Sequence, residues 1–167
     1  DLLLKQIYVY EAQQNWEKSG NAVERLYALY PNDSDVRDKY YTWTYQKAKI
    51  DFNDKNYRDA LWGFLKVSET PEYNKFAPQY IFEIQASQKS YNEALKTINN
   101  LIAKNPLETQ HTLKKIELLM EMEEFDTAYN LAKQQYLNAP SKPELAYMYT
   151  NASLVYIKHL NKNEDYE

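Results

Sequence analysis

The sequence has no cysteine and only two glycines, Gly20 and Gly63, among its 167 residues. Without cysteine the chain has neither a disulfide framework nor a thiolate metal site, and its redox compartment cannot be inferred. The shortage of glycine disfavours a turn-rich β architecture and a phosphate-binding glycine loop, and it favours helices. No hydrophobic run approaches the roughly 18 residues of a membrane-spanning helix.

The chain is also poor in arginine, with only Arg25, Arg37 and Arg58, and it carries a net charge of −4. Nucleic-acid binders usually present a basic face with arginine to hold phosphates, so we expect no nucleic-acid partner. The abundance of Lys, Asn and Tyr favours an AT-rich bacterial genome as the source. Because the first residue is Asp1 rather than Met, we expect a piece of a longer protein.

One pattern occurs three times: "NYRDALWGFLKVSETP" at 56–71, "SYNEALKTINNLIAKNP" at 90–106 and "EFDTAYNLAKQQYLNAP" at 124–140. An aromatic residue is followed after three residues by alanine, and after seven and ten by mostly hydrophobic residues, so all four lie on one stripe of a helix. Small alanine predicts close approach of another helix, and proline ends each copy. The aligned residues are Tyr57, Tyr91 and Phe125; Ala60, Ala94 and Ala128; Phe64, Ile98 and Ala132; Val67, Leu101 and Gln135.

An amphipathic segment precedes each copy, at 36–53, 76–88 and 108–122, and a short polar link joins the two. Short links predict antiparallel helix neighbours. At the amino end, residues 2–16 and 21–31 are predicted to form a degenerate pair, with Trp16 on the first helix. After Pro140 one long helix is predicted, either a cap or the first helix of a further repeat. It is expected to end near residue 160, with Tyr166 in the place of a second-helix aromatic.

The second-helix pattern, with its period of 34 residues, resembles the tetratricopeptide repeat (TPR). The resemblance implies an all-α fold: a right-handed α-solenoid of antiparallel helix pairs, with about nine helices. It predicts one TPR-like domain over 1–167. This domain is divided into a degenerate repeat (1–34), three repeats (35–73, 74–107 and 108–141) and a capping helix or start of a further repeat (142–167).

The sequence has few candidate catalytic or metal-binding residues. His111 and His159 fit no metal-binding spacing, and His111 is expected to be a solvated surface residue. The acidic run from Glu117 to Asp126 lacks the glycine of a calcium loop and is expected to be a solvated helix end. We therefore expect no enzyme activity, no cofactor and no metal site. For Tyr40, Trp43 and Tyr147, both core packing and ligand contact remain open.

In TPR proteins the first helices line a concave groove, and the resemblance extends this role to matching positions here. A chaperone-tail clamp is disfavoured, because only the lysines fit its pattern. The mixed groove instead favours an extended or helical protein segment as partner, with glycan less favoured. The predicted partner-binding residues are Tyr45, Lys49, Asn53, Gln79, Glu83, Gln110, Lys114, Glu117 and Asn151.

The leading hypothesis is a non-catalytic scaffold that binds a partner polypeptide on the concave surface within a larger assembly. Two alternatives are a periplasmic or outer-membrane-associated domain of a bacterial secretion or polysaccharide export system, and a peptide-sensing receptor domain. The compartment stays open between the cytoplasm and the periplasm or an outer-membrane lipoprotein.

Overall fold

The computed structural model describes residues 2–164, which form nine α-helices and no strand. The chain divides into two compact units, Asp1–Ile81 and Phe82–Glu167, and the division falls within α5. None of the nine helices is both long and apolar enough to cross a membrane. The helices are α1 (Leu2–Ala12), α2 (Trp16–Leu29), α3 (Ser34–Asn53), α4 (Tyr57–Val67), α5 (Ala77–Ser87), α6 (Tyr91–Lys104), α7 (Thr109–Glu121), α8 (Phe125–Asn138) and α9 (Pro143–Glu164).

The second helices α4, α6 and α8 bury the stripe that the repeat predicted. Ala60, Ala94 and Ala128 are almost wholly inaccessible to solvent, as are the residues four positions further along each helix. The aromatic residues that open these helices are half-buried. The predicted all-α fold is thus confirmed, and the alanines of the repeat pattern are buried in it.

Four turns between paired helices share one backbone conformation. The residue two positions before α2, α4, α6 and α8 has a positive φ, although none of the four is glycine. At the second turn, the Lys55 N–H donates to the Phe52 carbonyl at 3.0 Å and the Asn56 N–H donates to the Asp51 carbonyl at 2.7 Å. This is the Schellman arrangement, which satisfies the last carbonyls of the preceding helix. The four left-handed residues are Gln14 (φ 53°), Lys55 (62°), Lys89 (57°) and Glu123 (63°).

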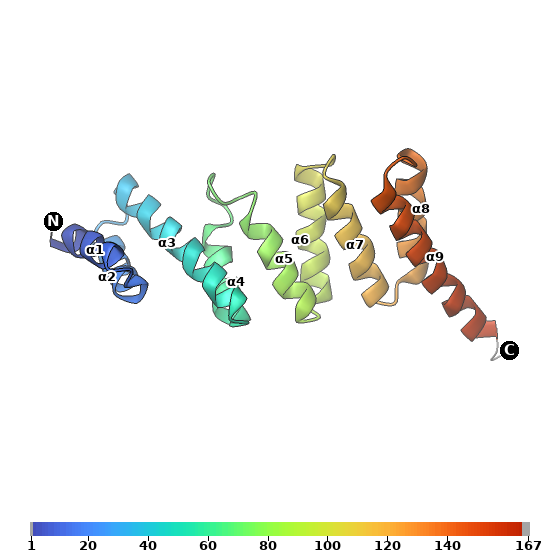
Figure 1. The fold of residues 1–167 in the computed structure, drawn as a ribbon, viewed down its shortest axis with the longest axis horizontal. Coiled ribbons are helices and arrows are strands. Elements are labelled where there is room, and N and C mark those ends of the chain that lie inside the picture. Colours follow the sequence, from blue (N-terminus) through green and yellow to red (C-terminus); the bar gives the residue numbers. More distant parts are fainter. Residues whose placement is uncertain (1, 165–167) are drawn as a thin grey trace. The chain divides into compact units, whose positions relative to one another are not determined.

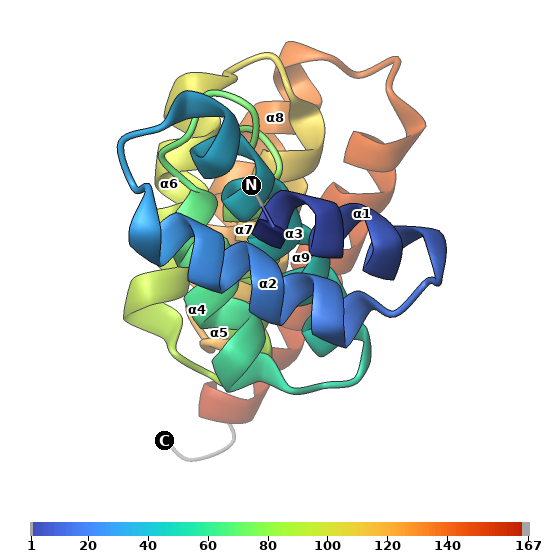
Figure 2. The same cartoon turned by 90° about the vertical axis from the view of Figure 1, so that its left-hand side faces the viewer.

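The first helix pair differs from the prediction. Helix α1 ends at Ala12, and Trp16 begins α2 instead of closing the first helix, with the Asn15 side chain accepting a hydrogen bond from the Lys18 N–H. The α1 and α2 helices lie side by side in both views (Figure 1, Figure 2). The equivalent left-handed residues Gln14 and Lys55 are 41 residues apart, seven more than the later spacing. Helix α3 takes up this difference: it has 20 residues, whereas α7 has 13. Seven residues are about two helical turns, so the insertion keeps the buried face in phase.

In the first unit, α1, α2 and α3 enclose a core that includes Ile7, Val23 and Leu26. Tyr40 is part of this core, and its ring stacks on that of Tyr27 with centroids 4.0 Å apart. Helix α3 packs against α2 on one side and α4 on the other.

In the second unit, α7 lies between α6 and α8, and its residues Ile116 and Leu119 share a core with α8 and α9. Tyr129 of α8 stacks on Tyr156 of α9 at 4.9 Å, and Tyr136 on Tyr149 at 5.3 Å. Helix α9 continues to Glu164, so the turn expected after residue 160 is absent from the described chain; Tyr166 lies outside the described residues.

His111 is not the solvated residue that the sequence suggested. It is buried near the start of α7, with 6% of its surface exposed, and its Nδ1 has no hydrogen-bond partner among the described residues. The neighbouring helices cover a wide arc of α7, which includes His111 and Thr112 as well as the apolar Leu113 and Ile116. The acidic residues from Glu117 to Asp126 that were expected to be solvated are exposed.

Candidate functional site

Tyr45, Lys49, Asn53 and Gln79 are the predicted partner-binding residues of the first unit. The first three follow one another at four-residue intervals on α3, so they share one side of the helix. The Lys49 ammonium lies 5.3 Å from the centre of the Tyr45 ring, and Asn53 is exposed. Gln79, on α5, is exposed and donates a hydrogen bond to the Lys75 carbonyl.

Tyr45 is half-buried within a group of aromatic rings. Its ring stacks on Tyr73 with centroids 4.5 Å apart and meets Phe64 edge-on at 5.8 Å. Burial raises the pKa of Tyr45, and the neighbouring Tyr80 hydroxyl raises it further. The Tyr45 side chain therefore stabilises the contact of α3 with α4 while one part of it remains accessible.

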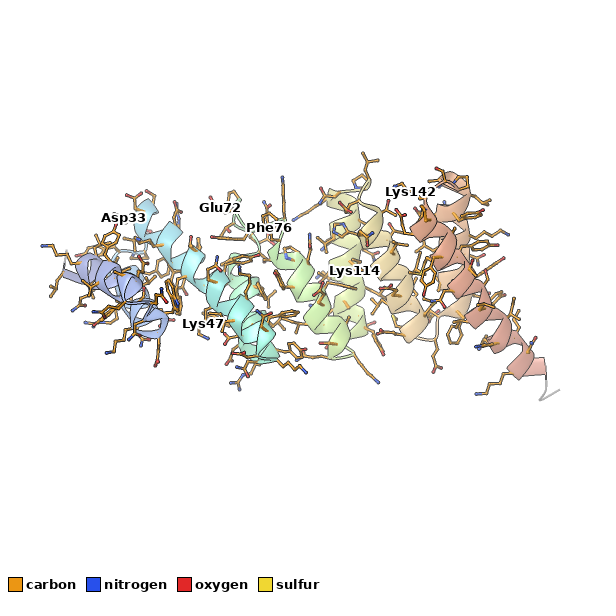
Figure 3. All side chains as sticks on the ribbon, in the orientation of Figure 1. Asp33, Lys47, Glu72, Phe76, Lys114 and Lys142 are labelled. Atoms are coloured by element: carbon orange, nitrogen blue, oxygen red, sulfur yellow. The ribbon has the colours of Figure 1, made fainter. Side chains whose placement is uncertain are left out.

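Glu83, Gln110, Lys114, Glu117 and Asn151 are the predicted residues of the second unit. The Lys114 ammonium, labelled in Figure 3, forms an ion pair with the Glu83 carboxylate at 2.6 Å, which joins α7 to α5. Gln110 and Glu117 are exposed on the same stripe of α7 as Lys114. Asn151 is half-buried on α9.

Helices α7 and α9 pack together, and near their amino-terminal ends the Lys142 ammonium donates a hydrogen bond to the Thr109 hydroxyl at 2.8 Å. The first helices of this unit therefore present polar side chains on adjoining elements. Whether these residues bind a partner remains a prediction.

The three aromatic residues left open by the sequence have different environments. Tyr40 belongs to the core of the first unit. Trp43 is half-buried, and Tyr147 is 72% exposed on α9. Tyr147 is thus available for contact with a partner, whereas Tyr40 is not.

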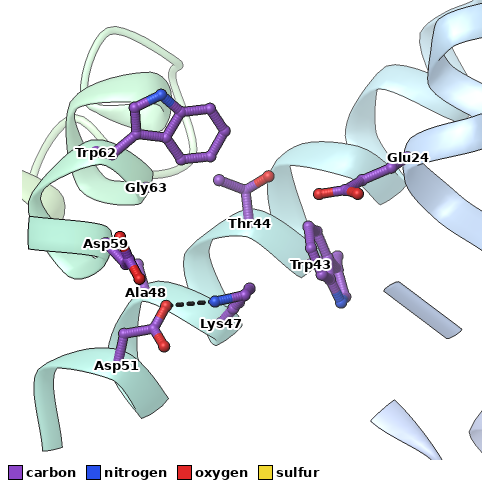
Figure 4. A pocket seen from close by; sticks show the side chains of 9 residues that line it. All are labelled: Glu24, Trp43, Thr44, Lys47, Ala48, Asp51, Asp59, Trp62 and Gly63. Atoms are coloured by element: carbon purple, nitrogen blue, oxygen red, sulfur yellow. Dashed lines mark hydrogen bonds and ion pairs between the residues drawn. The ribbon is translucent and has the colours of Figure 1, made fainter. Parts of the chain in front are cut away.

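Two clefts of the first unit were not found from the sequence, and Trp43 lines both. The smaller cleft, of about 150 Å³, lies among α2, α3 and α4 (Figure 4). There the Lys47 ammonium forms an ion pair with Asp51 at 2.6 Å, and Trp62 and Trp43 stand on either side of Thr44. The larger cleft, of about 480 Å³, lies among α1, α2 and α3 and has both acidic and aromatic lining residues.

The two glycines could have indicated these clefts. A Cβ on Gly20 would overlap the indole of Trp43, and a Cβ on Gly63 would come 2.7 Å from the Cβ of Ala48. A glycine inside a predicted helix commonly marks such a close approach. Among residues 2–164 there is no group of three or more histidine or acidic side chains that could hold a metal ion.

Antiparallel helix pairs, a period of 34 residues and a buried alanine in α4, α6 and α8 define the class of fold as a TPR-like all-α solenoid. Solved structures agree. A tetratricopeptide repeat protein from Parabacteroides merdae matches with a TM-score of 0.66 and 10% identity, over 92% of this chain and 58% of that one. The MamA protein matches with a TM-score of 0.57 and 14% identity, over 98% of this chain and 91% of that one.

The chain thus spans less than two thirds of the length of the Parabacteroides protein. No family model and no curated protein matches the sequence. At these identities the likeness shows the fold alone.

Proposed function

We propose that the chain is a non-catalytic scaffold whose first helices hold a segment of a partner polypeptide within a larger assembly. The observation that carries the proposal is the polar stripe of α7 formed by Gln110, Lys114 and Glu117, in which Lys114 is paired with Glu83 of α5. These side chains offer amide, ammonium and carboxylate groups on one exposed surface. An extended or helical segment can be held by such groups through hydrogen bonds.

The TPR-like fold supports the proposal, because helical repeats expose long surfaces on a core that each repeat shares only with its neighbours. Fold alone does not define function. In the first unit, Tyr45 and Lys49 would have the same role. The Lys49 ammonium, which lies over the face of the Tyr45 ring, could be replaced there by a group of the partner.

Site-specific photo-cross-linking in the native cells tests the proposal. A photoreactive residue is placed at Gln110 or Glu117, and as a matched control at Asn100, which is exposed on the second helix α6. We expect one polypeptide to cross-link from the first two positions and not from Asn100. Lys114→Glu, which places two carboxylates together, should abolish these cross-links. Equal cross-linking from all three positions, or none from Gln110 and Glu117, would contradict the proposal.

A further inference from the structure

The larger cleft of the first unit is built around the end of α1, the start of α2 and the amino-terminal half of α3. Its volume of about 480 Å³ falls in the ordinary range of ligand pockets. It contains none of the nine predicted groove residues, so its function is separate from the scaffold surface proposed above. Three of its lining residues, Asp35, Asp38 and Lys39, lie in the first turns of α3, the helix that is seven residues longer than α7.

Two indole rings, together with Val23, form the apolar part of the cleft. Trp16 is 58% exposed at the first position of α2, and Trp43 comes from α3. The Trp43 ring lies directly on the backbone of α2, because any Cβ at Gly20 would overlap it. This close packing limits the freedom of the Trp43 ring, so one aromatic wall is preformed. Tryptophan offers the most favourable aromatic face for a cation.

The polar part of the cleft is mainly acidic. Glu11, Asp35 and Asp38 contribute carboxylates, and none of the three forms an ion pair among residues 2–164. The single cation of the lining, Lys39, has its ammonium 4.9 Å from the centre of the Tyr8 ring. Three carboxylates against one ammonium leave the cleft with a net negative charge, which would repel an anionic ligand.

We propose that this cleft receives a basic side chain, preferably arginine, of a partner polypeptide. Its guanidinium would lie against the indoles of Trp16 and Trp43 while its N–H groups donate to the carboxylates of Asp35 and Asp38. A flat guanidinium suits this combination, because it stacks on aromatic rings and donates two parallel hydrogen bonds to a carboxylate. A purely apolar side chain in the cleft would displace water from its carboxylates without offering them a hydrogen-bond donor.

The test uses the whole chain with ¹⁵N-labelled tryptophan and two blocked pentapeptides of glycine with a central arginine or citrulline. Citrulline has nearly the same shape as arginine without its charge. The indole N–H resonances of Trp16 and Trp43 should shift and saturate with the arginine peptide. That of Trp62, which does not line this cleft, should stay unchanged. We expect the citrulline peptide to bind at least about fivefold more weakly than the arginine peptide.

The double substitution Asp35→Asn with Asp38→Asn should weaken binding of the arginine peptide by about fivefold. The matched control Glu24→Gln with Asp59→Asn removes two carboxylates from the smaller cleft and should leave binding unchanged. A second variant, Trp16→Leu, removes an aromatic wall and should also weaken binding, while circular dichroism checks that each variant is folded. Equal binding of both peptides, equal loss in the control, or equal shifts of all three indoles without saturation would overturn the proposal.

Discussion

The contact of α3 with α4 predicts an unusual response to Gly63→Ala. Inside a helix, alanine is normally favoured over glycine by about 1 kcal/mol. Here the new Cβ would lie 2.7 Å from the Cβ of Ala48, which is bound to the backbone and cannot rotate away. Carbon atoms prefer separations of about 3.5–4.0 Å, so the two helices would have to move apart by about 1 Å. Such overpacking costs about 1–3 kcal/mol. We therefore expect a net loss of about 1 kcal/mol in the free energy of unfolding.

Urea unfolding followed by circular dichroism measures this loss, and a double-mutant cycle assigns it to the contact. Ala48→Gly in the Gly63→Ala chain leaves one methyl group between the helices, as in the natural sequence. We expect the double variant to recover to within about 0.5 kcal/mol of the natural stability, a coupling that independent sites do not show. If Gly63→Ala instead stabilises the chain by about 1 kcal/mol, the helices do not approach as closely as the structure indicates.

Three further predictions use the same unfolding assay. Lys89→Gly should raise the free energy of unfolding by up to about 1 kcal/mol, because glycine adopts the left-handed backbone conformation of this position without steric strain. The control Lys96→Gly lies on the exposed side of α6 and should lower the free energy of unfolding by about 1 kcal/mol. Losses at both sites would refute this prediction. His111→Leu should gain about 1 kcal/mol because it removes an unpaired buried nitrogen; a loss would show that His111 makes a favourable interaction. Burial raises the pKa of Tyr40 above 10.0. The contribution of Tyr40 to the free energy of unfolding is therefore complete below about pH 10 and is lost as the pH rises through the folded-state pKa. Tyr40→Phe should reduce this alkaline loss, and an unchanged pH profile would contradict the assignment.

Much of the fold could be predicted because the spacing of residues in the repeat indicates which face of each helix is buried. Ala94, Ile98 and Leu101 are buried on one stripe of α6 as their spacing required. The boundary between the first two helices was placed incorrectly, because the period of 41 residues hides the alignment of Trp16 with Tyr57 and the later copies. In that pair, Ser19 of α2 takes the place of the alanine that marked the pattern elsewhere.

The candidate sites were less predictable. The resemblance to the TPR family selected Lys114 and Glu83 separately, but it did not predict that they form an ion pair. Likewise, the acidic and aromatic cleft joins Glu11 and Trp16 to residues on α3 that are remote in sequence. Periodicity identifies the face of a helix, but it cannot specify which side chains of another helix lie opposite.

The sequence by itself determined the helical character, the pairing of helices and the stripes that they bury, because these depend on local spacing and on the short reach of the connecting turns. Only the tertiary structure decided the burial of His111, the contacts of the two glycines and the cleft beside Trp43. These features depend on the distances between helices, which side-chain volumes set jointly across each contact. The residue pattern of one helix does not determine its distance from another helix.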